Sequence, residues 1–384
     1  MSTGTARGVR PDAVPLGIRA TVRHVGGLVD ARLRAELRDD HERYAPVGAS
    51  APDVVEAVRT AVFGGGKRLR PALAFLGFTA AGGAPGDPRV IDLGAALELL
   101  HTAYLVHDDV MDDSPTRRGA PTTHARFGET HLRSAYAGEP RRFGEGVAIT
   151  VGDYAFFGAM GLLAGSGPQA QREFFEMAKD VCVGQYLDLL AAARPAGGGP
   201  DPEVIARYKT ARYTVQGPLR LGAAVAGRLP ELGGAFSAYG RCAGLAFQLR
   251  DDLIGALGDP AVSGKPVGDD LRQGKRTPLL AFARERLADD HRARARPGPG
   301  AADLLDRIEA GRLPEAEIPA AQDLLRDLGV HDRVRRECAA LAAEAVAALG
   351  PVDLDGRAEE NLRQFASEVA DVSGIGDPGA RARP

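Results

Sequence analysis

Carboxylates are concentrated in one short stretch of the chain, segment 107–113, which contains two adjacent aspartate pairs. Asp108 and Asp112 are four residues apart, as are Asp109 and Asp113, so each pair would share one face of a helix. Like charges at this spacing repel by a few tenths of a kcal/mol, and the negative end of the helix dipole adds to the cost. A cation would compensate, and carboxylates combined with phosphate oxygens suit Mg²⁺. The alternative is a solvated acidic helix end.

A second pair of aspartates, Asp251 and Asp252, follows an apolar run and is preceded by Gln248. Gly255 occupies the position one turn after Asp251, so this cluster alone is a weak metal signal. Together with the first cluster, it predicts the opposite wall of a shared metal site. Neither cluster has the alternating spacing of an EF-hand loop, which excludes that motif.

Basic residues are grouped near both aspartate clusters. Segment 64–71, GGGKRLRP, places three cations beside glycines whose backbone N–H groups are open to an anion. It is not a P-loop, because Arg68 stands where Ser or Thr should follow Gly-Lys. Arg117 and Arg118 follow the first cluster, and guanidinium groups match diphosphate oxygens bidentately. One such group would be an ordinary surface charge, but further cations recur at Lys209, Lys265 and Lys275.

Helices must position these groups, because apolar residues recur at three- and four-residue spacing and no long run alternates as a strand would. Asp87 and Pro88 predict the start of a helix whose apolar face leads to Asp108. The apolar run 154–164 is too short to span a bilayer and predicts a buried helix. Other helices are expected over about 15–44, 52–63, 143–164, 168–193, 202–227 and 235–257, and then in shorter pieces to about 370.

The composition excludes several classes of protein. Of the 384 residues, 44% are hydrophobic and 26% are charged, which is ordinary for a globular protein and excludes disorder throughout. A net charge of −3 and an aromatic content of 5% disfavour a nucleic-acid-binding module.

The cysteines and the ends of the chain bear on its location and organisation. Cys182, Cys242 and Cys338 lie far apart, which excludes a disulfide framework and indicates a reduced, cytoplasmic protein. The first ten residues are not followed by the apolar region of a signal peptide. We expect one domain over 15–372, with flexible ends at 1–14 and 373–384.

The motifs, taken in order, resemble those of the trans-isoprenyl diphosphate synthases, also called polyprenyl synthetases. The resemblance implies an all-α fold of the isoprenoid synthase type I, a helical bundle around a central cavity, in a homodimer without stable membrane insertion. It implies a prenyltransferase that joins isopentenyl diphosphate head to tail to an allylic diphosphate, using about three Mg²⁺ ions shared with diphosphate. The matching residues are segments 65–71, 108–112 and 117–119, Lys209, Thr210, Gln248, Asp251, Asp252, Gly274 and Lys275.

The resemblance also assigns roles to individual residues. The implied metal ligands are Asp108, Asp112 and Asp251, supported by Asp109, Asp252 and Asp270. The residues that match the site for the diphosphate of isopentenyl diphosphate are Lys67, Arg70, His101 and Arg118. Those that match the allylic diphosphate site are Arg117, Lys209, Lys265 and Lys275, with Thr210 and Gln248 lining the reaction centre. His107 is interpreted as a packed residue, because the departing diphosphate is able to accept the proton.

Two residues before the first aspartate cluster bear on product length. By resemblance, a bulky residue here blocks elongation; Ala103 is small and Tyr104 is large, which favours geranylgeranyl over farnesyl diphosphate. The alternative for Tyr104 is a core aromatic residue with a satisfied hydroxyl.

Alternatives to a geranylgeranyl diphosphate synthase stay open at the level of the sequence. They are a farnesyl diphosphate synthase, a terpene cyclase, and a non-catalytic partner subunit. A cyclase would not need a second diphosphate site, and the partner-subunit hypothesis rests on Gly255, which replaces the last acid of the family's second motif. We expect activity to survive that replacement, because Asp251, the first acid of the motif, is the one most needed for metal; weaker metal binding is the alternative.

Overall fold

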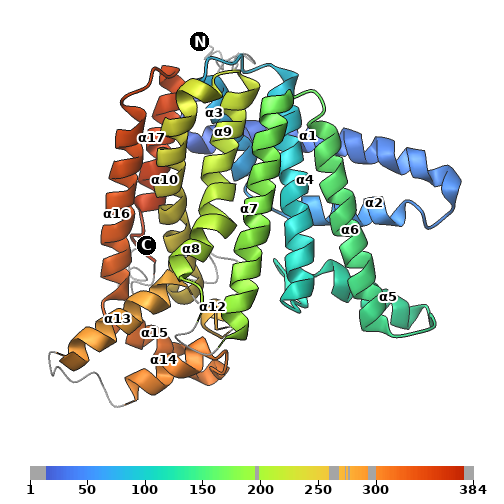
Figure 1. Ribbon diagram of the computed structural model, residues 1–384. Helices are drawn as coiled ribbons and strands as arrows, with labels where there is room; N and C mark the ends of the chain where they lie inside the picture. The colour runs from blue at the N-terminus through green and yellow to red at the C-terminus, as the bar shows by residue number, and fades with distance from the viewer. Residues whose placement is uncertain are drawn as a thin grey trace, which may run out of the picture. The chain divides into compact units, whose positions relative to one another are not determined.

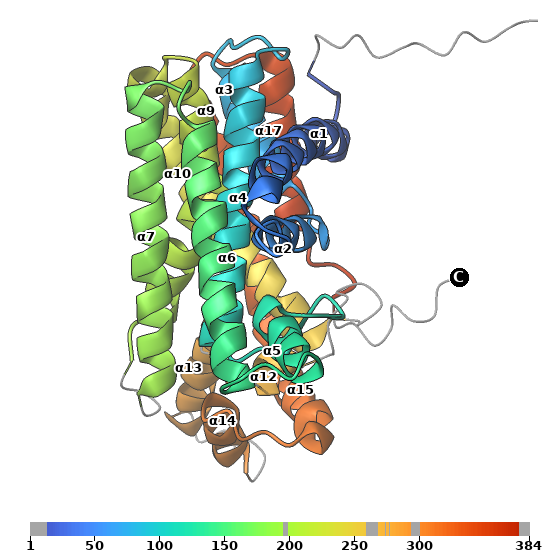
Figure 2. The ribbon, with the colours of Figure 1, turned by 90° about the vertical axis from the view of Figure 1, so that its right-hand side faces the viewer.

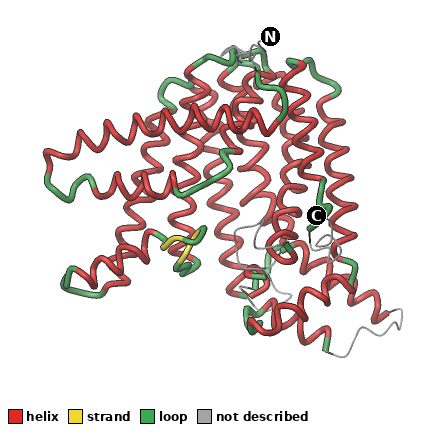
Figure 3. Tube along the Cα trace, turned by 180° about the vertical axis from the view of Figure 1, so that it is seen from behind, coloured by secondary structure: helices red, strands yellow, loops and turns green. Residues whose placement is uncertain are grey.

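The computed structural model describes residues 14–194, 199–258, 268–272, 274–275, 277–292 and 300–375. Nearly all of them are helical, as Figure 3 shows, which confirms the predicted all-α fold. The strands within these ranges, β1 (Thr116–Arg117) and β2 (Ala120–Pro121), pair as one short antiparallel hairpin that the sequence analysis did not predict. None of the helices in the described ranges combines the length and the apolar character needed to cross a membrane.

The chain divides into two compact units, and each collects residues from distant parts of the sequence. Unit 1 contains Met1–Glu173, Pro218–Gly233 and Leu354–Asn361. Unit 2 contains Phe174–Gly217, Gly234–Asp353 and Leu362–Pro384. The two aspartate clusters therefore belong to different units.

Unit 1 is built on two long helices, α4 (Pro88–Met111) and α6 (Pro140–Leu162), which lie side by side in Figures 1 and 2. Helix α1 (Ile18–Tyr44) runs across α4, as Figure 3 shows from behind. This unit also contains the β1–β2 hairpin, η1 (Ala45–Val47), α2 (Asp53–Phe63), α3 (Leu69–Ala80), α5 (Thr123–Arg133) and most of α9 (Gly217–Val225).

Helix α4 begins where the sequence predicts, because the Asp87 carboxylate accepts a hydrogen bond from the Arg89 backbone N–H at 2.9 Å. Pro88 occupies the first helical position, where its missing N–H costs nothing. The helix ends at Met111, so the first aspartate cluster lies at its C-terminal end.

The prediction of a buried helix over segment 154–164 is correct for only one face of α6. Ala155 and Ala159 are buried, but Phe157 keeps 66% of its surface exposed and Met160 keeps 36%. Small residues on one face pack inside the unit, and the large apolar residues between them face outward.

Unit 2 contains most of α7 (Pro168–Ala193) and of α10 (Leu229–Leu257), which match two predicted helices. The single helix expected over 202–227 is instead three elements: α8 (Pro202–Ile205), the π-helix η2 (Ala206–Gln216) and α9. In unit 1, segment 69–80, which the sequence analysis left unassigned, is helix α3. The other elements of unit 2 are α12 (Asp269–Arg272), α13 (Pro278–Arg292), α14 (Ala301–Glu309), η3 (Glu315–Glu317), α15 (Ile318–Asp327), α16 (Val330–Leu349) and most of α17 (Gly356–Ala370).

Candidate active site

Two loops of unit 1 bring basic side chains together. The first, residues 64–70, comprises the connection from α2 to α3 and the first two residues of α3, and is called here the basic loop. The second is the turn of the β1–β2 hairpin, where Arg118 (φ 54°) and Gly119 (φ 77°) both adopt the left-handed conformation of a tight two-residue turn. The Arg118 guanidinium donates a hydrogen bond to the Gly65 carbonyl, so the hairpin turn rests on the basic loop.

His101 of α4 lies within the electrostatic field of these arginines. Burial, and then the positive charges of Arg70, Arg118 and Arg117, hold the pKa of His101 well below its ordinary value of 6.5. The ring is therefore neutral at pH 7 and presents one N–H donor and one acceptor. We call the group formed by Lys67, Arg68, Arg70, His101, Arg117 and Arg118 the Arg-rich region. It includes all four residues predicted to bind isopentenyl diphosphate.

Arg117 connects the Arg-rich region to the first aspartate cluster. Its guanidinium lies 2.7 Å from Asp109 and 3.4 Å from Asp108. The Asp109 side chain is only 6% exposed; burial raises the pKa of this carboxyl, and the charge of Arg117 opposes that shift. Asp112 and Asp113 are exposed at the end of the helix. The short ion pair occupies Asp109, whereas Asp108 has the longer contact and lies nearer to solvent.

The remaining predicted residues of α4 take distinct places. His107 packs against α6: its Nε2 lies 3.1 Å from the Ile149 carbonyl, and a Cβ at Gly152 would overlap its ring. The structure thus agrees with the interpretation of His107 as a packed residue. Ala103 is buried and Tyr104 is half-buried, one turn before Asp108.

In unit 2, Lys209 and Thr210 lie in the π-helix η2. The Lys209 ammonium donates to Asp188 of α7 at 2.6 Å, and these side chains are 29% and 35% exposed. A Cβ at Gly184 would come within 2.5 Å of the Lys209 backbone nitrogen, so glycine permits the close approach of α7 to η2. We call Asp188, Lys209 and Thr210 the Lys209 region.

Sequence reasoning missed Asp188. No local pattern connects Asp188 to Lys209, because the two residues are separated by 21 positions and lie on different helices. Only the fold reveals the pair.

The second aspartate cluster lies near the C-terminal end of α10 in unit 2. Gln248 donates to Asp252 at 2.5 Å, and Asp252 is 6% exposed, whereas Asp251 is exposed. Lys275 is also exposed, and Asp270 belongs to α12. The predicted residue Lys265 lies outside the described residues.

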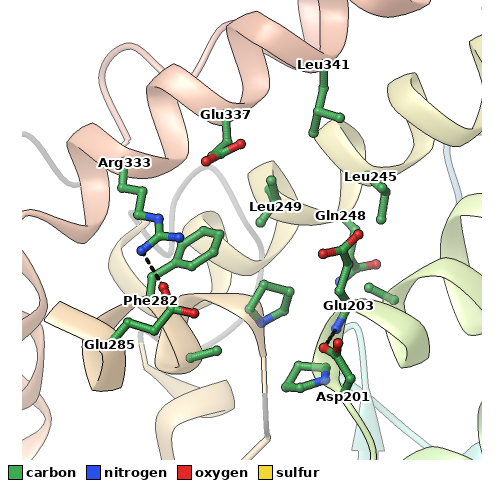
Figure 4. A pocket seen from close by; sticks show the side chains of 14 residues that line it. Asp201, Glu203, Leu245, Gln248, Leu249, Phe282, Glu285, Arg333, Glu337 and Leu341 are labelled. Carbon is green, nitrogen blue, oxygen red and sulfur yellow. Dashed lines mark hydrogen bonds and ion pairs between the residues drawn. The ribbon is translucent and has the colours of Figure 1, made fainter. Parts of the chain in front are cut away.

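Gln248 also lines a cavity of about 310 Å³ in unit 2, shown in Figure 4. Arg333 of α16 pairs with Glu285 of α13 at 2.7 Å across one side. Because most of the charged residues that line this cavity are acidic, it disfavours a diphosphate. The charged residues that line the cavity are Asp201, Glu203, Glu285, Arg333 and Glu337.

Comparisons with known proteins identify the family. The polyprenyl synthetase family model matches residues 52–297. A short chain isoprenyl diphosphate synthase from Methanothermobacter thermautotrophicus is 34% identical over 269 residues, covering 68% of this chain and 77% of the relative. An octaprenyl diphosphate synthase from Escherichia coli is 35% identical over 221 residues, covering 57% of this chain and 62% of that protein.

A solved structure is similar over most of the chain. The crystal structure of geranylgeranyl pyrophosphate synthase from Corynebacterium glutamicum, complexed with isoprenyl diphosphate and magnesium, superposes with a TM-score of 0.81. It is 35% identical, and the match covers 90% of this chain and 98% of that one. The helical fold and the relatives are those of a prenyltransferase. The chain belongs to the polyprenyl synthetase family.

Proposed function

We propose that this prenyltransferase condenses isopentenyl diphosphate with an allylic diphosphate to make geranylgeranyl diphosphate, and that it depends on Mg²⁺. The observation that carries the proposal is the Arg-rich region beside the first aspartate cluster. The basic loop and the β1–β2 hairpin supply cations for a diphosphate, and the C-terminal end of α4 supplies carboxylates for a metal.

The Arg-rich region supports binding of isopentenyl diphosphate without a metal. Lys67, Arg70 and Arg118 would contact the diphosphate oxygens, and the neutral ring of His101 would donate an N–H. Glu98, which belongs to the same neighbourhood, has its carboxylate paired with Arg68 at 2.8 Å and leaves the site cationic.

The aspartate clusters fit Mg²⁺ by the chemistry of their donors, which are all oxygens. In the described part of the chain, no three His, Cys, Asp or Glu side chains converge to hold a metal by themselves. Mg²⁺ suits one or two carboxylates combined with phosphate oxygens and water, so the substrate would complete its coordination. Asp108, Asp112 and Asp251 would be ligands, and Asp109 and Asp252 would support them.

The proposed reaction begins when the allylic diphosphate loses its diphosphate. Bound Mg²⁺ would supply charge neutralisation for the departing oxygens. Arg117, Lys209, Lys265 and Lys275 would hold the same group, with their contacts strengthening as negative charge builds. Thr210 and Gln248 would line the reaction centre. Lys67, Arg70, His101 and Arg118 would hold isopentenyl diphosphate so that its double bond attacks the allylic carbon, and the proton lost next would pass to the departing diphosphate.

Product length rests on Ala103 and Tyr104. A half-buried tyrosine one turn before Asp108 supports a limit on chain growth, and the small Ala103 beside it supports a limit that is not severe. Geranylgeranyl diphosphate is the proposed product, although relatives of this chain include an octaprenyl diphosphate synthase.

The test is incubation of the purified chain with isopentenyl diphosphate and each allylic diphosphate in turn, followed by chromatographic sizing of the product. We expect a twenty-carbon product with Mg²⁺ and none with a chelator. A fifteen-carbon product would identify a farnesyl diphosphate synthase. Conversion of an allylic diphosphate without isopentenyl diphosphate would identify a cyclase, and no product would favour a non-catalytic subunit.

We propose a homodimer as well. On α6, Ile149, Phe157 and Met160 lie on one exposed face. On α7, Phe175, Val183 and Tyr186 are likewise exposed. Such apolar faces support an interface with a second copy of the chain. Light scattering of the parent chain should give twice the chain mass, and Phe157→Glu should reduce the mass to that of one chain. A parent chain with the mass of a monomer would contradict the proposal.

We also propose a cytoplasmic location, which the spacing of the cysteines supports.

A further inference from the structure

Arg68 stands in the middle of the basic loop, yet its side chain turns inward. Its guanidinium donates to Asp30 of α1 at 2.7 Å, to Glu98 of α4 at 2.8 Å and to the Val62 carbonyl at 2.9 Å. The side chain is only 10% exposed. Because all three nitrogens have protein acceptors, Arg68 is poorly placed to bind a ligand.

The backbone at Arg68 is also special. Its φ of 49° lies in the left-handed region, which a residue with a Cβ rarely adopts and which costs about 1 kcal/mol or more. Arg68 is the N-cap residue of α3, so this conformation sets the direction of the chain between Lys67 and Arg70. The ion pairs with two different helices hold the strained residue in place.

The close packing around Arg68 extends to the other predicted ligands. A Cβ at Gly66 would lie 3.0 Å from the Arg68 guanidinium and 3.6 Å from that of Arg118, so both arginines close on the same glycine. On the other side, a Cβ at Gly26 of α1 would lie 3.2 Å from the Arg68 side chain. Movement of Arg68 would therefore change the basic loop and the support of Arg118.

Glu98 supplies the negative charge at this point. Its side chain is 5% exposed; burial raises the pKa of the carboxyl, and the charges of Arg68 and Arg70 oppose that shift. A carboxylate in this position reduces the repulsion among clustered arginines. The same residue both anchors Arg68 and offsets its charge.

We infer that the ion triad Asp30–Arg68–Glu98 holds the basic loop in the conformation that binds the diphosphate of isopentenyl diphosphate. Arg68 is thus a positioning residue, which acts through Lys67 and Arg70 without touching the substrate. The inference rests on the proposed function of the Arg-rich region. It predicts that breaking the triad impairs binding of one substrate and spares the other.

The experiment compares Asp30→Asn and Glu98→Gln with the parent enzyme in two-substrate kinetics. We expect each variant to raise KM for isopentenyl diphosphate at least fivefold, with kcat and KM for the allylic diphosphate within twofold. Asp30 is 33% exposed, so Asp30→Asn is compatible with folding even where a change at the buried Glu98 is not. Thermal unfolding of each variant separates loss of structure from loss of binding.

A matched control is present on the same helices. Arg32 of α1 donates through Nε to Asp92 of α4 at 2.7 Å, as Arg68 does to Asp30, and Asp92 is 35% exposed. Asp92→Asn should leave both KM values unchanged. It removes an ion pair between α1 and α4 that lies outside the basic loop.

Each other outcome contradicts the inference in a different way. If the triad acts only as negative charge near an anion site, both variants should lower KM for isopentenyl diphosphate. If the triad only stabilises the fold, the midpoint of thermal unfolding should fall while both KM values stay unchanged. If the parent enzyme itself makes no product from isopentenyl diphosphate, the proposed function fails, and that result is distinct from active enzyme with insensitive variants.

Discussion

The Arg-rich region of unit 1 and the Lys209 region of unit 2 both contain cations predicted to bind a diphosphate, and these cations are held in different ways. In the first, Arg68 is 10% exposed and is held by carboxylates from two helices. In the second, Lys209 is 29% exposed and pairs with Asp188 of α7 at 2.6 Å. Arg68 is held at all three guanidinium nitrogens, whereas a lysine on a flexible stem adapts more easily.

This difference matches the two substrates. Isopentenyl diphosphate keeps its diphosphate throughout the proposed reaction, so a preorganised site suits it. The allylic substrate instead loses its diphosphate, on which negative charge develops, so the residues that hold this group need to strengthen their contacts during the reaction. Substitutions in the two regions should therefore change different kinetic parameters.

Asp108→Asn should lower kcat/KM by about a hundredfold or more, because the carboxylate would hold the metal that neutralises the departing group. Steady-state kinetics at saturating Mg²⁺ measures the effect. The matched control is Asp113→Asn in the same cluster, where the exposed side chain lies 3.6 Å from Arg141. Equal losses in the two variants would show that Asp108 has no special role.

Asp188→Asn should lower kcat by about tenfold, because Lys209 loses the carboxylate that orients its ammonium. KM for isopentenyl diphosphate should stay within twofold. Glu176→Gln serves as control, since it breaks a similar 2.6 Å pair with Lys179 on the exposed side of α7. Parent-like kinetics for Asp188→Asn would remove the Lys209 region from the account of catalysis.

Tyr104→Ala should shift the products toward longer chains, because it removes the bulk that limits growth of the prenyl tail. Chromatography of the reaction products measures the shift, and kcat should change little. An unchanged product distribution would instead support Tyr104 as a core aromatic residue.

His101→Gln should make stability less sensitive to acid by up to about 1.4 kcal/mol per pH unit. The folded-state pKa of His101 is held well below 6.5, so below pH 6.5 the unfolded chain binds more protons and the parent protein loses stability as pH falls. Glutamine does not titrate and removes this loss. Urea unfolding at pH 7 and pH 5.5 measures both proteins; equal pH dependence would show that the histidine is protonated in the fold.

Local chemistry made some of the structure predictable. The Asp87–Pro88 start of α4 follows from capping rules that act within one turn, and the helical spacing of apolar residues was enough for α1, α2, α7 and α10. The same spacing overstated burial at Phe157, because an apolar residue that faces outward has the same local pattern as one that packs inside. The π-helix η2 approaches α7 closely at Gly184, and no local pattern encodes that contact.

The candidate site was likewise predictable only in part. Residue types and spacing singled out the aspartates and the basic loop, because like charges so close together need a partner. They did not separate Arg68, which points inward, from Lys67 and Arg70 on either side of it. They also gave no sign of Asp30, Glu98 or Asp188, since each pairs with a basic residue more than twenty positions away.

The most direct test of the central claim is a comparison of Arg70→Met with Lys209→Met by initial-rate kinetics over a grid of both substrates. The account predicts that Arg70→Met raises KM for isopentenyl diphosphate at least tenfold and leaves KM for the allylic diphosphate within twofold. Lys209→Met should show the reverse, with a lower kcat. Equal increases in both KM values for both variants would contradict the assignment of Arg70 to isopentenyl diphosphate and of Lys209 to the allylic diphosphate.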